Sequence, residues 1–158
     1  MTIRVFNEGW RHQYHRMKRS RDRFNAPHQI ADEYDDDFYH AIQDTWHLKD
    51  WISNDADLGP LGHRIAQEAA TIPLLDIIAD LANCTKHLVL TKTIRAGGEF
   101  ESPSSTVSLH DEAMDRTITI GLEDGSEYTG EVLLDDAHEA WENLLTGHGC
   151  YELYDERH

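Results

Sequence analysis

The chain has 158 residues, of which 39% are hydrophobic and 28% are charged, and its formal net charge is −16. This length fits one domain that buries a core, and four tryptophans argue against a disordered chain. No run reaches the ~20 apolar residues of a membrane helix, and the first residues lack the apolar stretch of a signal peptide. Cys84 and Cys150 follow no disulfide-framework or metal-binding spacing. We therefore expect a cytosolic bacterial protein without a membrane segment.

The first segment of the chain is basic although the protein is acidic. Residues 1–23 contain seven basic and two acidic side chains, so this segment carries +5 and the other 135 residues carry −21. A body this acidic repels phosphate backbones and anionic membranes, which leaves the basic arm Arg11–Arg23 as the one place for a nucleic acid. The arm, residues 1–24, is predicted to lie against an acidic body, either its own or that of a partner.

The pattern of apolar residues predicts helices in the first half of the chain. The first segment, about Glu8 to Phe24, is interpreted as a basic helix or arm and is broken by Asn25–Pro27. A helical core follows over residues 34–87. Its first helix opens at Asp35–Asp37, where acidic residues suit the helix dipole, and continues to about Asn54. Its second part covers about residues 61–86, and Pro73 is expected to divide it.

Alternating apolar residues then predict a β-meander over residues 88–134. Leu88, Leu90 and Ile94 mark a possible strand, and residues 102–105 form a loop. The segment Ile118–Leu122 alternates cleanly and precedes Asp124-Gly125, a strong hairpin signal, with a return strand over about Glu127–Leu134.

A closing helix over residues 135–147 should be capped by Asp135 or Asp136 and ended by Gly147. The predicted fold of the single domain 1–158 is therefore α+β: an antiparallel helical bundle with a small antiparallel β-meander or hairpin before a C-terminal helix.

Polar side chains form two rows on the predicted helices, at spacings that place residues on one face. The first row consists of His40, Gln43, Asp44, His47, Asp50 and Asn54. The second consists of Asp76, Asp80, Asn83 and His87. If the two helices pack antiparallel, the rows could face each other across a groove.

Three hypotheses account for these rows. His47, Asp50, Asp80 and His87 could bind a divalent metal, because imidazole and carboxylate together suit zinc, iron or manganese. Alternatively, His47 or His87 acts as a general acid or base that Asp50 or Asp80 orients. In the third hypothesis the rows are structural, either as solvated helix faces or as buried polar pairs, which is the commonest role of such patterns.

Two strings together, Trp46-His-Leu-Lys-Asp-Trp51 and Asp80-Leu-Ala-Asn-Cys-Thr-Lys-His87, resemble a signature of small uncharacterised bacterial and phage proteins. The resemblance covers about residues 36–90 and implies no activity. It implies a shared set of residues that includes the binding candidates Trp51, Asn83 and Lys86, with His47, Asp50, Asp80 and His87.

The helical half is also similar in outline to HEPN domains, which are bundles found in RNA-cleaving toxins. The family pattern is an Arg followed after four to six residues by a His, late in the bundle. Here that spacing joins Arg23 to His28, in an early break, and the closing helix lacks it.

Two functions remain open on this basis. The first is a non-catalytic interaction or accessory protein that forms a homo-oligomer, with a dimer expected and a further protein partner possible. The alternative is a metal- or histidine-dependent hydrolase, of which a HEPN-like ribonuclease is one form. Neither a Walker loop nor an HExxH sequence is present, so no cofactor is identified beyond a possible divalent metal.

Overall fold

The computed structural model describes residues 9–87, 104–110, 113–122 and 124–150. Within these ranges the chain forms five α-helices and three β-strands. They are α1 (Trp10–Asn25), α2 (Ala31–Ser53), α3 (Pro60–Ala69), α4 (Pro73–His87), β1 (Ser104–His110), β2 (Ala113–Gly121), β3 (Glu127–Thr129) and α5 (Gly130–Gly147).

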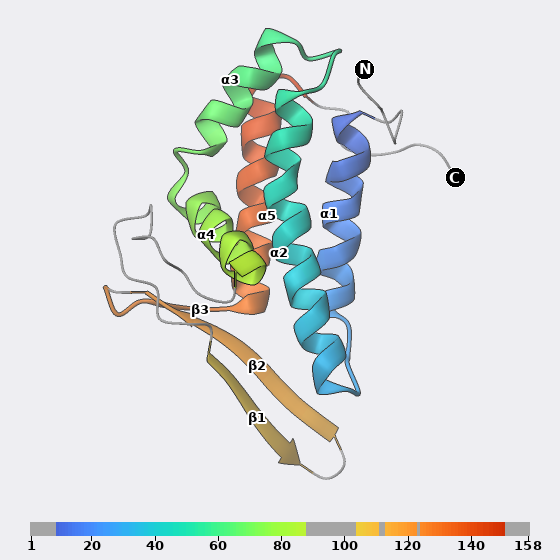
Figure 1. Cartoon of the computed structure of the whole chain (residues 1–158), viewed down its shortest axis with the longest axis vertical. Helices are drawn as coiled ribbons and strands as arrows, with labels where there is room; N and C mark the ends of the chain where they lie inside the picture. Colours follow the sequence, from blue (N-terminus) through green and yellow to red (C-terminus); the bar gives the residue numbers. More distant parts are fainter. Residues whose placement is uncertain (1–8, 88–103, 111–112, 123, 151–158) are drawn as a thin grey trace.

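The helices form an antiparallel bundle, and the sheet lies at one end of it (Figure 1). Helices α1 and α2 make an antiparallel hairpin, and α5 runs beside both of them. The largest buried side chains come from all three: Trp10 and Tyr14 of α1, Phe38 of α2, and Trp141 of α5. The predicted α+β fold with a C-terminal helix after the hairpin is confirmed.

The predicted helices are present, with one boundary moved. Pro73 does divide the second part of the helical core, since α3 ends at Ala69 and α4 begins at Pro73. Helix α2, however, begins at Ala31 rather than at Asp35. Tyr34 is buried in the core, which requires a helical turn before the acidic run, and Asp32 and Glu33 occupy the first turn.

The three strands are antiparallel and lie in the order β1-β2-β3. The predicted Asp124-Gly125 hairpin is present: Gly125 has a φ of 82°, and its N–H donates to the carbonyl of Leu122. Strand β1 begins at Ser104, inside the predicted loop. The possible strand at Leu88–Ile94 lies outside the described residues.

The return strand is shorter than predicted, because α5 begins at Gly130 instead of at Asp135 or Asp136. Thr129 is the actual N-cap, and its side chain accepts a hydrogen bond from the N–H of Val132. Val132, which lies within the predicted return strand, is 48% exposed on the helix, while Leu134 is buried in the core. No helix in the described ranges is long and apolar enough to cross a membrane.

Candidate functional site

The polar row of α2 lies on the solvent face of that helix. His40, His47, Asp50 and Asn54 are exposed, whereas the residues that pack α2 into the bundle, such as Ile42 and Leu48, are fully buried. Buried and polar residues thus occupy opposite sides of the helix. These four residues of the row therefore face solvent, whereas Gln43 and Asp44 are half-buried and the Gln13 side chain of α1 donates to the carbonyl of Asp44.

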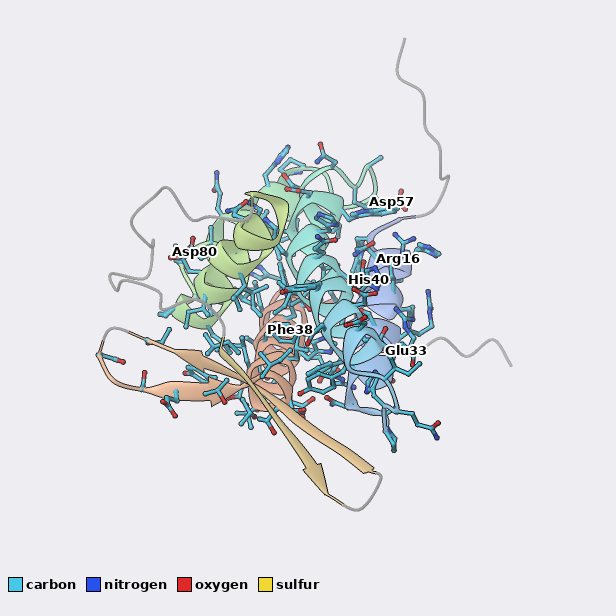
Figure 2. The ribbon with its side chains drawn as sticks, turned by 60° about the horizontal axis from the view of Figure 1, so that its bottom comes forward. Arg16, Glu33, Phe38, His40, Asp57 and Asp80 are labelled. Carbon is cyan, nitrogen blue, oxygen red and sulfur yellow. The ribbon has the colours of Figure 1, made fainter. Side chains whose placement is uncertain are left out.

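The polar row of α4 is divided between the interior and the surface. Asp80 is only 5% exposed, while Asn83 is exposed. Figure 2 shows Asp80 and His40 on different sides of the molecule. The side chains of Lys86 and His87 lie outside the described residues, so the metal and acid–base roles of this set stay predictions. Among the described side chains, no group of three or more histidines, cysteines or carboxylates could hold a metal ion.

The two tryptophans of the WHLKDW string lie on either side of the α2 solvent face. The Nζ atom of Lys49 lies 4.2 Å from the centre of the Trp46 ring, a distance typical of a cation–π contact. Trp51 is half-buried, and its ring centre is 6.1 Å from that of His12 on α1. Both tryptophans therefore help pack α2 while keeping one edge at the surface.

The predicted basic arm is an integral helix of the bundle. Trp10, Tyr14, Met17 and Phe24 of α1 are all buried in the core. The helix carries six basic residues and one acidic residue, and it lies beside two acidic helices, α2 with seven acids and one lysine, and α5 with five acids and no basic residue. Of the two predicted locations, the described part of the arm, residues 9–24, thus lies against its own acidic body.

Ion pairs fasten α1 to both neighbours. Lys18 Nζ lies 4.0 Å from Glu142 Oε1, and Arg21 Nε lies 3.7 Å from Asp135 Oδ1, both on α5. Arg23 Nε lies 3.7 Å from Asp37 Oδ1 on α2. Two exposed arginines of α1, Arg16 and Arg19, have no ion pair with any described residue. They retain the basic character of the outer surface of α1.

A histidine–carboxylate pair closes the turn between α1 and α2. Nε2 of His28 lies 2.8 Å from Oδ2 of Asp37, and the His28 side chain is 8% exposed. The imidazole also packs against the rings of Phe24 and Tyr34. Arg23 reaches the other oxygen of Asp37, so the Arg and His of the HEPN-like spacing meet at one carboxylate. The sequence suggested the spacing but gave no sign of Asp37 as its partner.

Tyr34 links the helices to the sheet at the same end of the bundle. Its hydroxyl donates to Glu131 Oε1 over 2.9 Å and accepts from the N–H of Ile118 over 3.3 Å. Burial, and then the hydrogen bond to Glu131, hold the pKa of this phenol well above its usual range. The hydroxyl therefore remains a neutral hydrogen-bond donor.

His138 is a histidine that sequence patterns missed, because acidic residues surround it on α5. It is 3% exposed, and its Nε2 atom has no hydrogen-bond partner in the structure. Burial, with help from Arg21 and Lys18, lowers its pKa to about 3. His138 is consequently neutral at physiological pH and fills space between α5 and α1.

Comparisons with known proteins give no relative for this chain. No family model, no curated protein and no solved structure matches it.

Proposed function

We propose that the chain is a non-catalytic interaction protein that works as a homo-oligomer. The observation that carries this proposal is the charge asymmetry between neighbouring helices. α1 carries a net +5 and its outer surface keeps Arg16 and Arg19 free of ion pairs with described residues, whereas α2 carries −6 and exposes Asp36. Opposite charges on one surface give a second copy something to recognise.

The net charge sets the conditions for association. Each copy carries −16, so two copies repel each other at long range. Salt screens distant charges more strongly than charges in contact. We therefore expect the oligomer to form more readily at moderate salt than at very low salt.

Native mass spectrometry of protein purified without chelators tests the proposal directly, because one spectrum reports subunit number and any bound metal or RNA. A dimer with nothing bound is the expected result. A monomer at every protein and salt concentration would contradict the proposal, and a tightly bound metal that is lost in His47→Ala would replace it with the hydrolase.

A histidine-dependent hydrolase is a second candidate, favoured by the contact of His28 with Asp37. A carboxylate that holds one ring nitrogen fixes the tautomer of the imidazole and leaves the other nitrogen to exchange a proton with a substrate. Here Asp37 holds Nε2, so Nδ1 would act, and Arg23 beside it could bind a phosphate.

Cleavage of single-stranded RNA, measured for the wild type, His28→Asn and Arg23→Gln, tests this candidate. Loss of cleavage in both variants with an unchanged circular dichroism spectrum would support it. His47→Ala serves as a comparison, because that histidine is exposed on the outer side of α2. No cleavage by the wild type, or equal cleavage by all four proteins, would eliminate His28 as a catalytic residue.

A further inference from the structure

We propose that two copies of this chain associate through the outer face of the α1–α2 hairpin, with the basic side of α1 in each copy against the acidic side of α2 in the other. This inference rests on the proposed homo-oligomer and specifies its interface. Four residues define the surface, named here the hairpin face: Arg16 and Arg19 on α1, and Asp36 and Asp44 on α2.

Contacts inside one copy fix the relative positions of these residues along the two helices. Arg23 pairs with Asp37 at one end of the hairpin, and the Gln13 side chain donates to the carbonyl of Asp44 toward the other end. Because the two helices run in opposite directions, residues between Gln13 and Arg23 on α1 lie beside residues between Asp44 and Asp37 on α2. Along the helix axis, Arg19 therefore lies between Asp36 and Asp44. In Figure 2 Arg16 and His40, one from each helix, lie close together on this side.

A twofold axis parallel to the two helices makes the hairpin face complementary to itself. Rotation by 180° about such an axis keeps every residue at its level but exchanges the two sides. The α1 helix of one copy is then placed over α2 of the other. Arg16 and Arg19 of each copy face the stretch that contains Asp36 and Asp44 in its partner, and this happens twice.

The side chains of the hairpin face are available for such contacts. Arg16, Arg19 and Asp36 are exposed and Asp44 is half-buried. Arg16, Arg19 and the Asp44 and Asp36 carboxylates have no ion pair with another described residue. By contrast, the acids of α5 that flank α1, Asp135 and Glu142, are already engaged by Arg21 and Lys18. Charge complementarity therefore favours α2 over α5 as the partner surface.

Two variants with reversed charge test the interface by mixing. The first is Arg16→Glu with Arg19→Glu, and the second is Asp36→Arg with Asp44→Arg. In a dimer of either variant, like charges meet at both of the equivalent α1–α2 contacts. Its dimer dissociation constant should therefore rise about tenfold or more. A one-to-one mixture restores opposite charges at both contacts and should form a heterodimer. Arg64→Glu and Glu139→Arg, at exposed positions on α3 and α5, are the matched controls.

Light scattering after size-exclusion chromatography, with circular dichroism to verify folding, reads out every outcome. Two monomeric variants that form a heterodimer on mixing, beside dimeric controls, establish the interface. A wild-type dimer that both variants preserve overturns the hairpin face and leaves the proposed homo-oligomer standing. A monomeric wild type, whether or not it binds RNA through Arg16 and Arg19, contradicts both the hairpin-face interface and the proposed homo-oligomer.

Discussion

Nε2 of His28 and Oδ2 of Asp37 lie 2.8 Å apart, and this contact ties the turn after α1 to the second turn of α2. Both side chains are largely sheltered from solvent, so the contact is stronger than a surface ion pair. The imidazole also packs on Phe24 of α1 and Tyr34 of α2, so His28 contacts both helices of the hairpin.

A double-mutant cycle with His28→Ala and Asp37→Ala should give a coupling energy of about 1–2 kcal/mol in urea unfolding, as expected for a hydrogen bond to a charged group. The same cycle on Glu68 and His148, whose Nε2 is also 2.8 Å from a carboxylate oxygen but at the surface, is the control. A coupling energy for His28 and Asp37 no larger than that of the control would show that the contact merely accompanies the packing.

Tyr34→Phe removes the hydroxyl that joins α2, α5 and β2. The N–H of Ile118 then loses its acceptor, and Glu131 loses a donor. We expect a loss of about 1–3 kcal/mol in the free energy of unfolding, because a buried donor is left unsatisfied. Tyr39→Phe, at an exposed position on the same helix, should change stability little. Equal effects of the two substitutions would mean that the hydroxyl of Tyr34 holds nothing together.

Gly130, the first residue of α5, is required by close packing. A Cβ atom there would lie 3.0 Å from Cζ of Phe24 and 3.0 Å from Cε2 of Phe38. Gly130→Ala should therefore destabilise the protein by about 1–3 kcal/mol, the usual cost of overpacking. Gly147→Ala, at the other end of the helix with nothing within 4 Å, should stabilise it by up to about 1 kcal/mol. In thermal unfolding, Gly130→Ala should lower the Tm and Gly147→Ala should raise it.

His138 should make the fold sensitive to acid. Its pKa is about 3 in the folded chain, against an ordinary value of 6.5. Below pH 6.5 the unfolded chain therefore binds a proton at this histidine that the folded chain does not bind. The stability contributed by the neutral imidazole is complete above pH 6.5 and is lost as the pH falls toward 3. The loss should approach about 1.4 kcal/mol per pH unit.

Urea unfolding of the wild type and of His138→Leu between pH about 7.5 and about 4 measures this effect. The free energy of unfolding of the variant should fall less steeply with decreasing pH, and the difference in slope should correspond to the uptake of one proton. Parallel declines would mean that carboxylates alone account for the acid sensitivity.

The sequence predicted the elements better than their ends. Apolar periodicity located α2, α4 and α5, and the Asp124-Gly125 dipeptide marked the hairpin turn, but Val132 and Leu134 fit the two-residue period of a strand as well as a helix. The Thr129 cap is a local contact, but the packing of Gly130 against Phe24 and Phe38, which also favours the helix, depends on tertiary structure. For the same reason α2 begins four residues before the acidic run.

The site was less predictable than the fold. The row of α2 was recognisable as one helical face, but the sequence could not show that this face points to solvent. Asp80 shares its row with Asn83, yet one is buried and the other exposed. The contacts of His28 and the burial of His138 depend on residues from more than one helix. A pattern read along a single helix therefore cannot predict them.

The hydroxyl of Tyr14 on α1 donates to Glu142 on α5 across a separation of 128 residues. Helix α1 therefore packs against α5, and a ribosome must add well over 100 residues after Tyr14 before Glu142 can meet it. Until then the nascent chain presents a half-built bundle with apolar surface open to other proteins. The bundle is thus completed only after α5 has been made, and chaperones that bind exposed apolar helices have their opportunity in that interval.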